Sequence, residues 1–153
     1  QDFASVDLVL GWDPTYLQLL GLDQTGATPL LQSNFPANDL FGLNEAVPPQ
    51  DGDGLYVAYA PLSGPIVATP SGTLLTTFTF ASLAETPGTT VGALVSGGNP
   101  TRNTQVLADD PPAQVITGQL GSALVTIVPE PSCLMLAGLA LGCVLLPSRK
   151  RTV

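Results

Sequence analysis

The fold class follows from one stretch, Val6-Asp7-Leu8-Val9-Leu10-Gly11-Trp12-Asp13-Pro14-Thr15-Tyr16-Leu17, which contains two strands and the turn between them. The alternation over residues 5–10 predicts a strand with Val6, Leu8 and Leu10 on one face and Asp7 and Val9 on the other. Residues 11–15 predict a turn in which Asp13 bonds to the backbone. Residues 16–22 predict a second, apolar strand.

Strand signals of the same kind recur as far as residue 128. Further strands are predicted at residues 55–60, 73–80, 89–95 and 123–128, separated by segments rich in Gly, Pro, Asn and Asp. No segment before residue 128 shows a sustained helical period, so the sequence predicts an all-β antiparallel sandwich. Residues 24–54 lack a clear strand pattern, and because so long a loop is uncommon, we expect a short strand or helical turn there, at residues 40–43.

Residues 6–17 resemble the opening of cohesin modules, where a strand is followed by an aromatic residue, Asp-Pro and then Leu. Three later segments are similar to other cohesin strands, namely residues 54–60, 72–80 and 89–91. The resemblance covers residues 6–128 and implies a jelly-roll β-sandwich domain over residues 1–127. The sequence departs from the cohesin pattern in two ways: the first cohesin strand is absent, and residues 97–118 are irregular. Cellulosomal cohesins bind dockerins, but a shared fold does not transfer that partner.

The C-terminal residues have three adjacent parts: Pro129-Glu130-Pro131, an uncharged apolar run over residues 133–146, and the cations Arg149, Lys150 and Arg151. The two prolines keep the motif extended. The run predicts a transmembrane helix over about residues 133–147, although it is shorter than the roughly 20 residues usually needed, so a buried core helix is the alternative. Because a basic cluster resists translocation, the sandwich is expected outside the cytoplasm.

These three parts together resemble the PEP-CTERM sorting signal of Gram-negative bacteria, and they define a second segment at residues 128–151. The resemblance implies processing by an exosortase, a membrane transpeptidase-like cysteine protease. It further implies passage through the inner membrane and final delivery to the cell surface or to an exopolysaccharide-rich biofilm matrix. The sequence begins at Gln1 without a secretory leader, so we expect a leader or an N-terminal segment, with the first strand of the sandwich, to be missing from it.

Charge and cysteine content agree with export. Eleven of the twelve acidic residues precede the motif and only Arg102 opposes them there, which leaves the sandwich with ten net negative charges. Such a surface repels nucleic acid and anionic lipid, so neither is expected as a partner of the sandwich. Cys133 and Cys143 both lie in the apolar run, about 15 Å apart if it is helical, which excludes a bond between them. The sandwich is therefore expected to fold without disulfides.

Catalytic signals are weak. The chain contains no histidine, which excludes Ser-His-Asp and Cys-His arrangements, so we expect a protein that is not an enzyme and needs no cofactor. The carboxylate pairs Asp51/Asp53 and Asp109/Asp110 raise the alternatives of a polysaccharide-acting enzyme or a calcium site. The simpler interpretation is that both pairs lie in loops or turns, so Asp51 and Asp53 are only weak candidates for metal ligands.

Trp12, Tyr56 and Tyr59 are the candidate ligand-binding residues, because aromatic side chains can stack on sugar rings. We expect both tyrosines on one face of their strand, where core or surface packing is the simpler interpretation. The main functional hypothesis is an exported, exosortase-processed structural or adhesive matrix protein. The alternative is a carbohydrate- or protein-binding module of the cohesin type. Candidate partners are the sorting enzyme, the membrane through the C-terminal helix, and exopolysaccharide or another surface protein.

Overall fold

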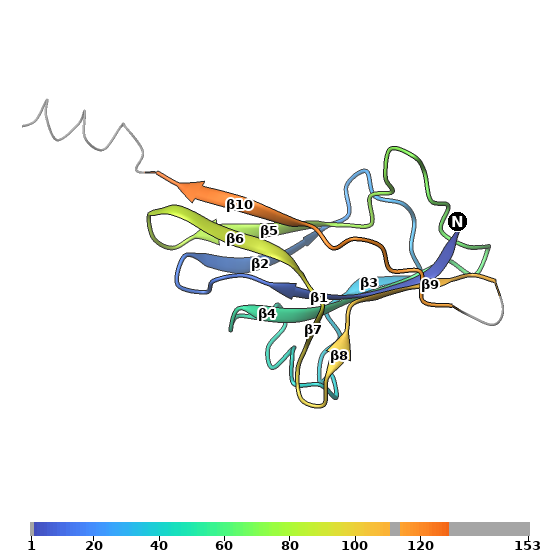
Figure 1. Cartoon of the computed structure of the whole chain (residues 1–153), viewed down its shortest axis with the longest axis horizontal. Helices are drawn as coiled ribbons and strands as arrows, with labels where there is room; N and C mark the ends of the chain where they lie inside the picture. Colours follow the sequence, from blue (N-terminus) through green and yellow to red (C-terminus); the bar gives the residue numbers. More distant parts are fainter. Residues whose placement is uncertain (1, 111–113, 129–153) are drawn as a thin grey trace, which may run out of the picture.

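The computed structural model describes residues 2–110 and 114–128, which form an all-β sandwich (Figure 1). No helix long and apolar enough to cross a membrane occurs within this part of the chain. The predicted transmembrane helix, the Pro129-Glu130-Pro131 motif and the basic residues 149–151 lie outside the described residues. The strands are β1 (Phe3–Gly11), β2 (Leu17–Asp23), β3 (Gln32–Asn34), β4 (Asp53–Tyr59), β5 (Thr77–Ser82), β6 (Thr86–Leu94), β7 (Ser96–Gly97), β8 (Arg102–Asn103), β9 (Gln105–Ala108) and β10 (Ser122–Ile127).

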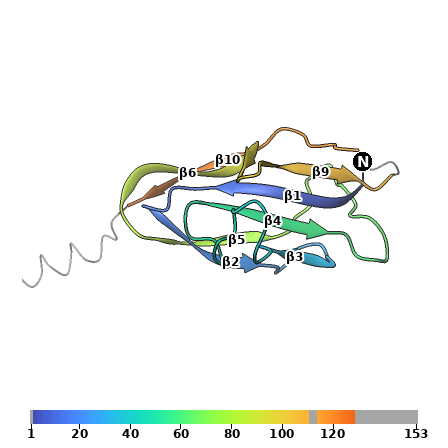
Figure 2. The ribbon, with the colours of Figure 1, turned by 90° about the horizontal axis from the view of Figure 1, so that it is seen from below.

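Two antiparallel sheets make up the sandwich (Figure 2). The large sheet has the order β10-β6-β1-β4-β3, and β9 also pairs with β1. The small sheet is the pair β2–β5, and β7–β8 forms a separate hairpin. Along one edge, β1 therefore changes partner from β9 to β6. At this junction the Thr104 hydroxyl accepts a hydrogen bond from the N–H of Val9 (2.9 Å) and donates one to the carbonyl of Leu94 (2.5 Å).

The main core lies between the two sheets and is built around aromatic side chains. Phe35, Tyr56 and Phe78 contact one another with ring centroids 5.5–6.1 Å apart, and Trp12 meets Phe80 edge-on at 5.6 Å. Such tilted and edge-on contacts are the preferred geometries of aromatic pairs. The apolar strand β2 adds Leu17 and Leu19 to the same cluster, as its pattern predicts.

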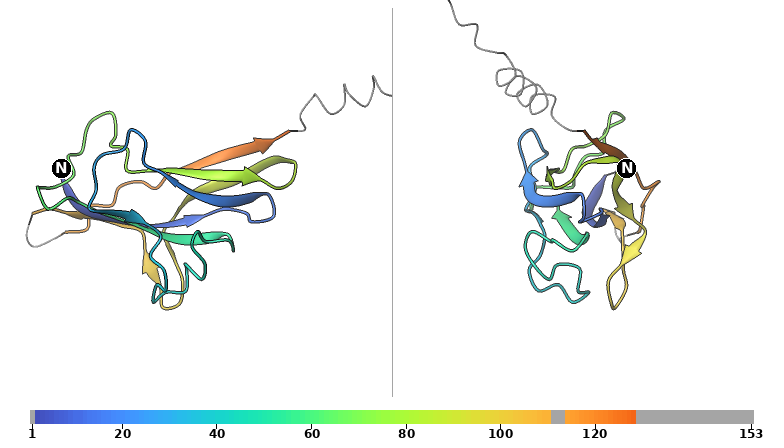
Figure 3. Two further views of the ribbon diagram at one scale, coloured as in Figure 1. Left: turned by 180° about the vertical axis from the view of Figure 1, so that it is seen from behind. Right: turned by 90° about the vertical axis from the view of Figure 1, so that its left-hand side faces the viewer.

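A second, smaller cluster covers the outer face of the large sheet. It contains Val9, Leu43, Leu55 and Val57, with Phe41 packed against it. Figure 3 shows the loop after β3 and the β7–β8 hairpin projecting on the same side of β1 and β4. The predicted faces of β1 are confirmed, because Val6 and Leu10 join the main core while Val9 joins the outer cluster. Both faces of β1 are consequently buried.

The long segment before β4 contains a short strand, as predicted, but not at residues 40–43. Its strand is β3, which pairs with Val57 to Tyr59 of β4, and residues 40–43 form a turn. The Asp39 carboxylate holds this turn by accepting backbone N–H bonds from Phe41 (2.8 Å) and Leu43 (3.2 Å). A short polar strand such as β3 has no strong local signal, so its pairing partner determines it.

Two other boundaries depart from the sequence prediction. Strand β5 starts at Thr77 instead of 73, because the Thr73 hydroxyl donates to the carbonyl of Val67 (2.8 Å) and keeps Thr73 in a loop. The segment 97–118, read as irregular, contains the second residue of β7 together with β8 and β9. The remaining predicted strands occur with ends shifted by one to three residues.

Candidate functional site: a groove beside strand β6

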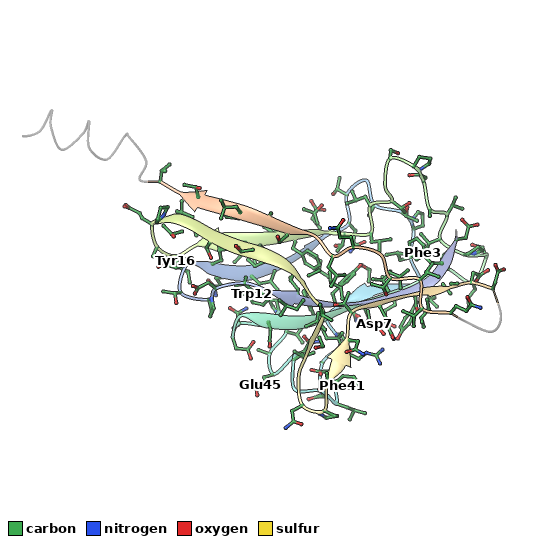
Figure 4. The ribbon with its side chains drawn as sticks, in the orientation of Figure 1. Phe3, Asp7, Trp12, Tyr16, Phe41 and Glu45 are labelled. Carbon is green, nitrogen blue, oxygen red and sulfur yellow. The ribbon has the colours of Figure 1, made fainter. Side chains whose placement is uncertain are left out.

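A groove opens where β1 ends and the chain crosses to the small sheet. Its volume is about 710 Å³, within the range of about 300–1,000 Å³ that is typical of ligand sites. One wall is the β1–β2 turn with Gly11, Trp12, Asp13, Pro14 and Tyr16. The opposite wall is β6, with residues 88–90 and 92–94, and Gly52 and Ser122 of β10 complete the lining. Figure 4 labels Trp12 and Tyr16 on the turn that forms the first wall.

Hydrogen bonds from backbone N–H groups hold the turn wall in place. The Asp13 carboxylate accepts the N–H of Thr15 (2.9 Å), which confirms the predicted bond to the backbone of the turn. The Trp12 N–H donates to the carbonyl of Gly52 (2.8 Å). Gly52 has a φ of +105°, and a Cβ there would lie 2.8 Å from Pro14 Cδ, so glycine is needed at this contact. These contacts fix the wall relative to β4.

The β6 wall presents unpaired backbone. Only Gly92 to Leu94 of β6 have partners in β1, whereas Thr86 to Val91 pair with β10 alone among the described residues. The Ala93 N–H donates to Gly121 on the β10 side (3.0 Å). Because N–H groups alternate in direction along an antiparallel strand, the N–H and C=O of Thr90 point into the groove.

Trp12 lines the groove but is largely buried in the core. Its side chain is 7% exposed, and its ring packs edge-on against Phe80. The indole N–H is buried and has no hydrogen-bond partner among the residues that the structure describes. Trp12 therefore contributes an unsatisfied donor near the groove, without an open ring face for stacking.

The two candidate tyrosines do not lie with Trp12. Tyr56 is 1% exposed in the main core, and its hydroxyl lies 2.7 Å from Ser33 Oγ. Burial raises the pKa of the Tyr56 hydroxyl, which the Ser33 bond partly offsets. Tyr59 is 40% exposed and pairs with Ser5 near the other end of β1. The expectation that both share one face is wrong, because residues three apart on a strand point to opposite faces.

The acidic pair Asp51 and Asp53 lies at the start of β4. The pKa of Asp53 is raised, first by burial and then by the negative charges of Asp51, Asp39 and Glu45. No group of three or more acidic or cysteine side chains in residues 2–110 and 114–128 is arranged to hold a metal ion. Asp109 and Asp110 are exposed beside the end of β9.

One ion pair with a buried carboxylate was not expected from the sequence. Arg102 of β8 bonds to the carboxylate of Asp7, to which Gln105 also donates (2.8 Å). The Arg102 guanidinium also lies 5.2 Å from the centre of the Phe41 ring. The sequence offered one signal, a single cation in a domain with an acidic residue inside an apolar strand. This pair joins the β7–β8 hairpin to the sheet, and neither of its residues lines the groove.

Comparisons with known proteins support the fold. No protein-family model matches the chain, and no curated protein matches it. A solved cohesin module from a Clostridium perfringens family 33 glycoside hydrolase is similar in structure, with a TM-score of 0.54 and 11% sequence identity. The match covers 84% of this chain and 76% of that module. The sandwich is cohesin-like. At this identity the similarity establishes the fold and leaves ligand and partner open.

Proposed function

We propose that the sandwich is a non-catalytic binding module, presented outside the cytoplasm by the sorting signal at residues 128–151. The observation that carries the binding role is the groove beside β6, in which a rigid turn faces a strand edge with unpaired backbone groups. Ligand sites commonly combine a preformed apolar hollow with a few polar groups. The similar solved module belongs to a glycoside hydrolase, which favours an accessory role for this fold over a catalytic one.

The groove chemistry also favours binding over catalysis. Among the described residues that line the groove, the only ionisable side chains are Asp13 and Tyr16. Asp13 already holds the turn through Thr15. Glycoside hydrolysis usually needs two carboxyl groups about 5–10 Å apart on either side of the scissile bond. A single engaged carboxylate does not provide that arrangement.

The sorting role depends on Pro129-Glu130-Pro131, the apolar run after it and the cations Arg149, Lys150 and Arg151. In this proposal an exosortase-type enzyme recognises the motif after the apolar run enters the inner membrane. A reporter fused after Val153 should then be cytoplasmic in the unprocessed protein. Periplasmic activity of that fusion would contradict the topology.

A structural or adhesive matrix role is the second candidate, and strand β10 favours it. This edge strand carries no charge and no proline, and its Leu124 is 75% exposed. Exposed edges of this kind tend to pair with other chains. Analytical ultracentrifugation discriminates between the two roles. A matrix protein should self-associate with increasing concentration, and a dedicated binding module should remain monomeric until its ligand is added.

A further inference from the structure

Strand β10 ends directly before the sorting motif. Its last residue is Ile127, and only Val128 separates that residue from Pro129. Residues 129–132 then connect Val128 to the apolar run that begins at Cys133. At no more than about 3.6 Å per residue, the chain from Val128 to Cys133 reaches at most roughly 18 Å. The motif is therefore kept close to the sandwich on one side and to the apolar run on the other.

This short connection limits how an enzyme can reach the motif. A small protein domain is about 30 Å across, which exceeds the roughly 18 Å between the sandwich and the apolar run. Extended peptide segments are also bound through their main chain over several consecutive residues. An enzyme that binds the motif in this way therefore needs residues before Pro129, and these belong to the sandwich.

The end of β10 pairs less regularly with β6 than its start does. Residues 122–125 pair in register with residues 89–92. A register shift then precedes Ile127, whose partner is Thr86. Pro87 lies in this part of β6 and has no N–H to donate to β10. The ladder between the two strands is therefore weakened at the end of β10, beside the start of β6 (Figure 1).

Side-chain packing at this end of the sandwich is also loose. A hollow of about 340 Å³ is lined by residues 126–128 on one side and residues 85–87 on the other. Thr126 is exposed, and its hydroxyl donates to a β6 carbonyl at 3.2 Å, which is long for an O–H···O bond. Ile127 is only partly buried, and Val128 is 70% exposed. Few interactions therefore have to break before residues 126–128 leave β6.

We propose that the sorting enzyme binds residues 126–128 together with the motif, so that the end of β10 leaves β6 before the chain is processed. This inference rests on the proposed sorting function and extends its recognition segment into the sandwich. The enzyme competes with β6 for the same backbone, because both bind it in an extended form. Loss of one strand pair and one side-chain bond shifts such an equilibrium by about tenfold, so the fold slows processing without preventing it.

A disulfide across the end of the two strands, the end disulfide, tests the proposal. Thr86→Cys with Ile127→Cys places cysteines at paired positions, where the Cα separation suits a disulfide. Cys133 and Cys143 are replaced by Ala in every chain, so that no other disulfide can form. The full chain is expressed in a Gram-negative host that carries an exosortase, and its shortening is followed by pulse-chase and immunoblotting. The end disulfide should slow processing by about tenfold or more.

A second disulfide in the same strand pair is the matched control. Thr90→Cys with Leu124→Cys joins two exposed, paired positions in the middle of β10 and leaves residues 126–128 free to open. This chain should be processed at the rate of the chain without either disulfide. A flexible linker of about six Gly and Ser residues, inserted after Val128, gives the reciprocal test. The linker should restore processing of the chain with the end disulfide, because the enzyme then finds extended backbone outside the sandwich.

Three results would overturn the inference. They are unchanged processing with the end disulfide, equal slowing by both disulfides, and an end-disulfide chain that stays full-length even with the linker. If the end disulfide does not form, the linker alone decides, and it should raise the processing rate of the otherwise unmodified chain about tenfold. An unchanged rate would then overturn the inference. If the chain without disulfide or linker is not processed at all, the sorting function itself fails, so the two failures are distinguishable.

Discussion

Asn44→Ala tests how the outer face of the sheet is held together. Asn44 is 3% exposed, and its side chain pairs with both backbone groups of Leu55. The Leu55 N–H donates to Oδ1 (2.9 Å), while Nδ2 donates to the carbonyls of Leu55 (2.8 Å) and Pro36 (3.0 Å). The amide thus continues the ladder on β4 beyond the end of β3, and it protects an edge that would otherwise be open.

The alanine variant leaves three backbone groups without their partner. A buried polar group without a partner costs about 1–3 kcal/mol, and the lower value applies to each group because water can enter the space. The free energy of unfolding should therefore fall by about 3 kcal/mol. Urea unfolding of a chain ending at Val128, followed by tryptophan fluorescence, measures this loss. Asn103→Ala, at an exposed position of β8, is the control and should change stability by less than about 0.5 kcal/mol. If Asn44→Ala loses no more than this control, the side chain does not hold the edge as described.

Three further predictions concern charge and cross-links. The pKa of Asp53 is raised in the folded state, so the contribution of Asp53 to stability declines as the pH rises from the ordinary pKa of 3.8 through the folded pKa. Asp53→Asn should therefore melt at a higher temperature than the parent near pH 7 and at the same temperature near pH 3. A lower melting temperature of the variant near pH 7 would contradict this. Arg102→Met leaves Asp7 buried without its cation and should lower the free energy of unfolding by about 2 kcal/mol. This is less than for fully buried pairs, because Arg102 is partly exposed. Adding Asp7→Asn to the same variant should recover most of the lost stability. Residues 1–128 contain no cysteine, so reductant and chelator should leave their melting temperature unchanged; a drop of several degrees in chelator would mean that Asp51 and Asp53 hold a metal.

Strands with strong local patterns could be read from the sequence. The alternation of β1 and the apolar residues of β2 and β4 reflect burial that each strand undergoes whichever strand lies beside it. β3, β7, β8 and β9 could not be read in this way, because they have only two to four residues each. The positions of β3 and β9 come from pairing with β4 and β1, which are distant in the sequence, whereas β7 and β8 pair with each other.

The site was predicted only in part. Trp12 and the Asp13 turn stood out as an aromatic residue beside a turn, and both line the groove. The groove itself arises from the different lengths of β1 and β6 past Gly11, which no local pattern encodes. Thr90 carries no chemical signal in the sequence, because its contribution is an unpaired backbone N–H and C=O. Asp7 and Arg102 carried one signal, a single cation and an acidic residue inside an apolar strand, but they are 95 residues apart and only the fold brings them together.

Processing of the C-terminal motif tests the central claim, that this module is sorted to the cell surface or matrix, most directly. The full chain and a variant with Ala at positions 129–131 are expressed in a Gram-negative host that carries an exosortase, and their size and location are followed by fractionation and immunoblotting. The parent should be shortened and leave the inner membrane. The variant should stay full-length and membrane-bound, because alanine lets a helix extend past Ser132 and removes the extended recognition site. Glu85→Ala, next to β6, is the control and should be processed normally. Release of the triple-alanine variant to the surface at the parent's rate would contradict the claim.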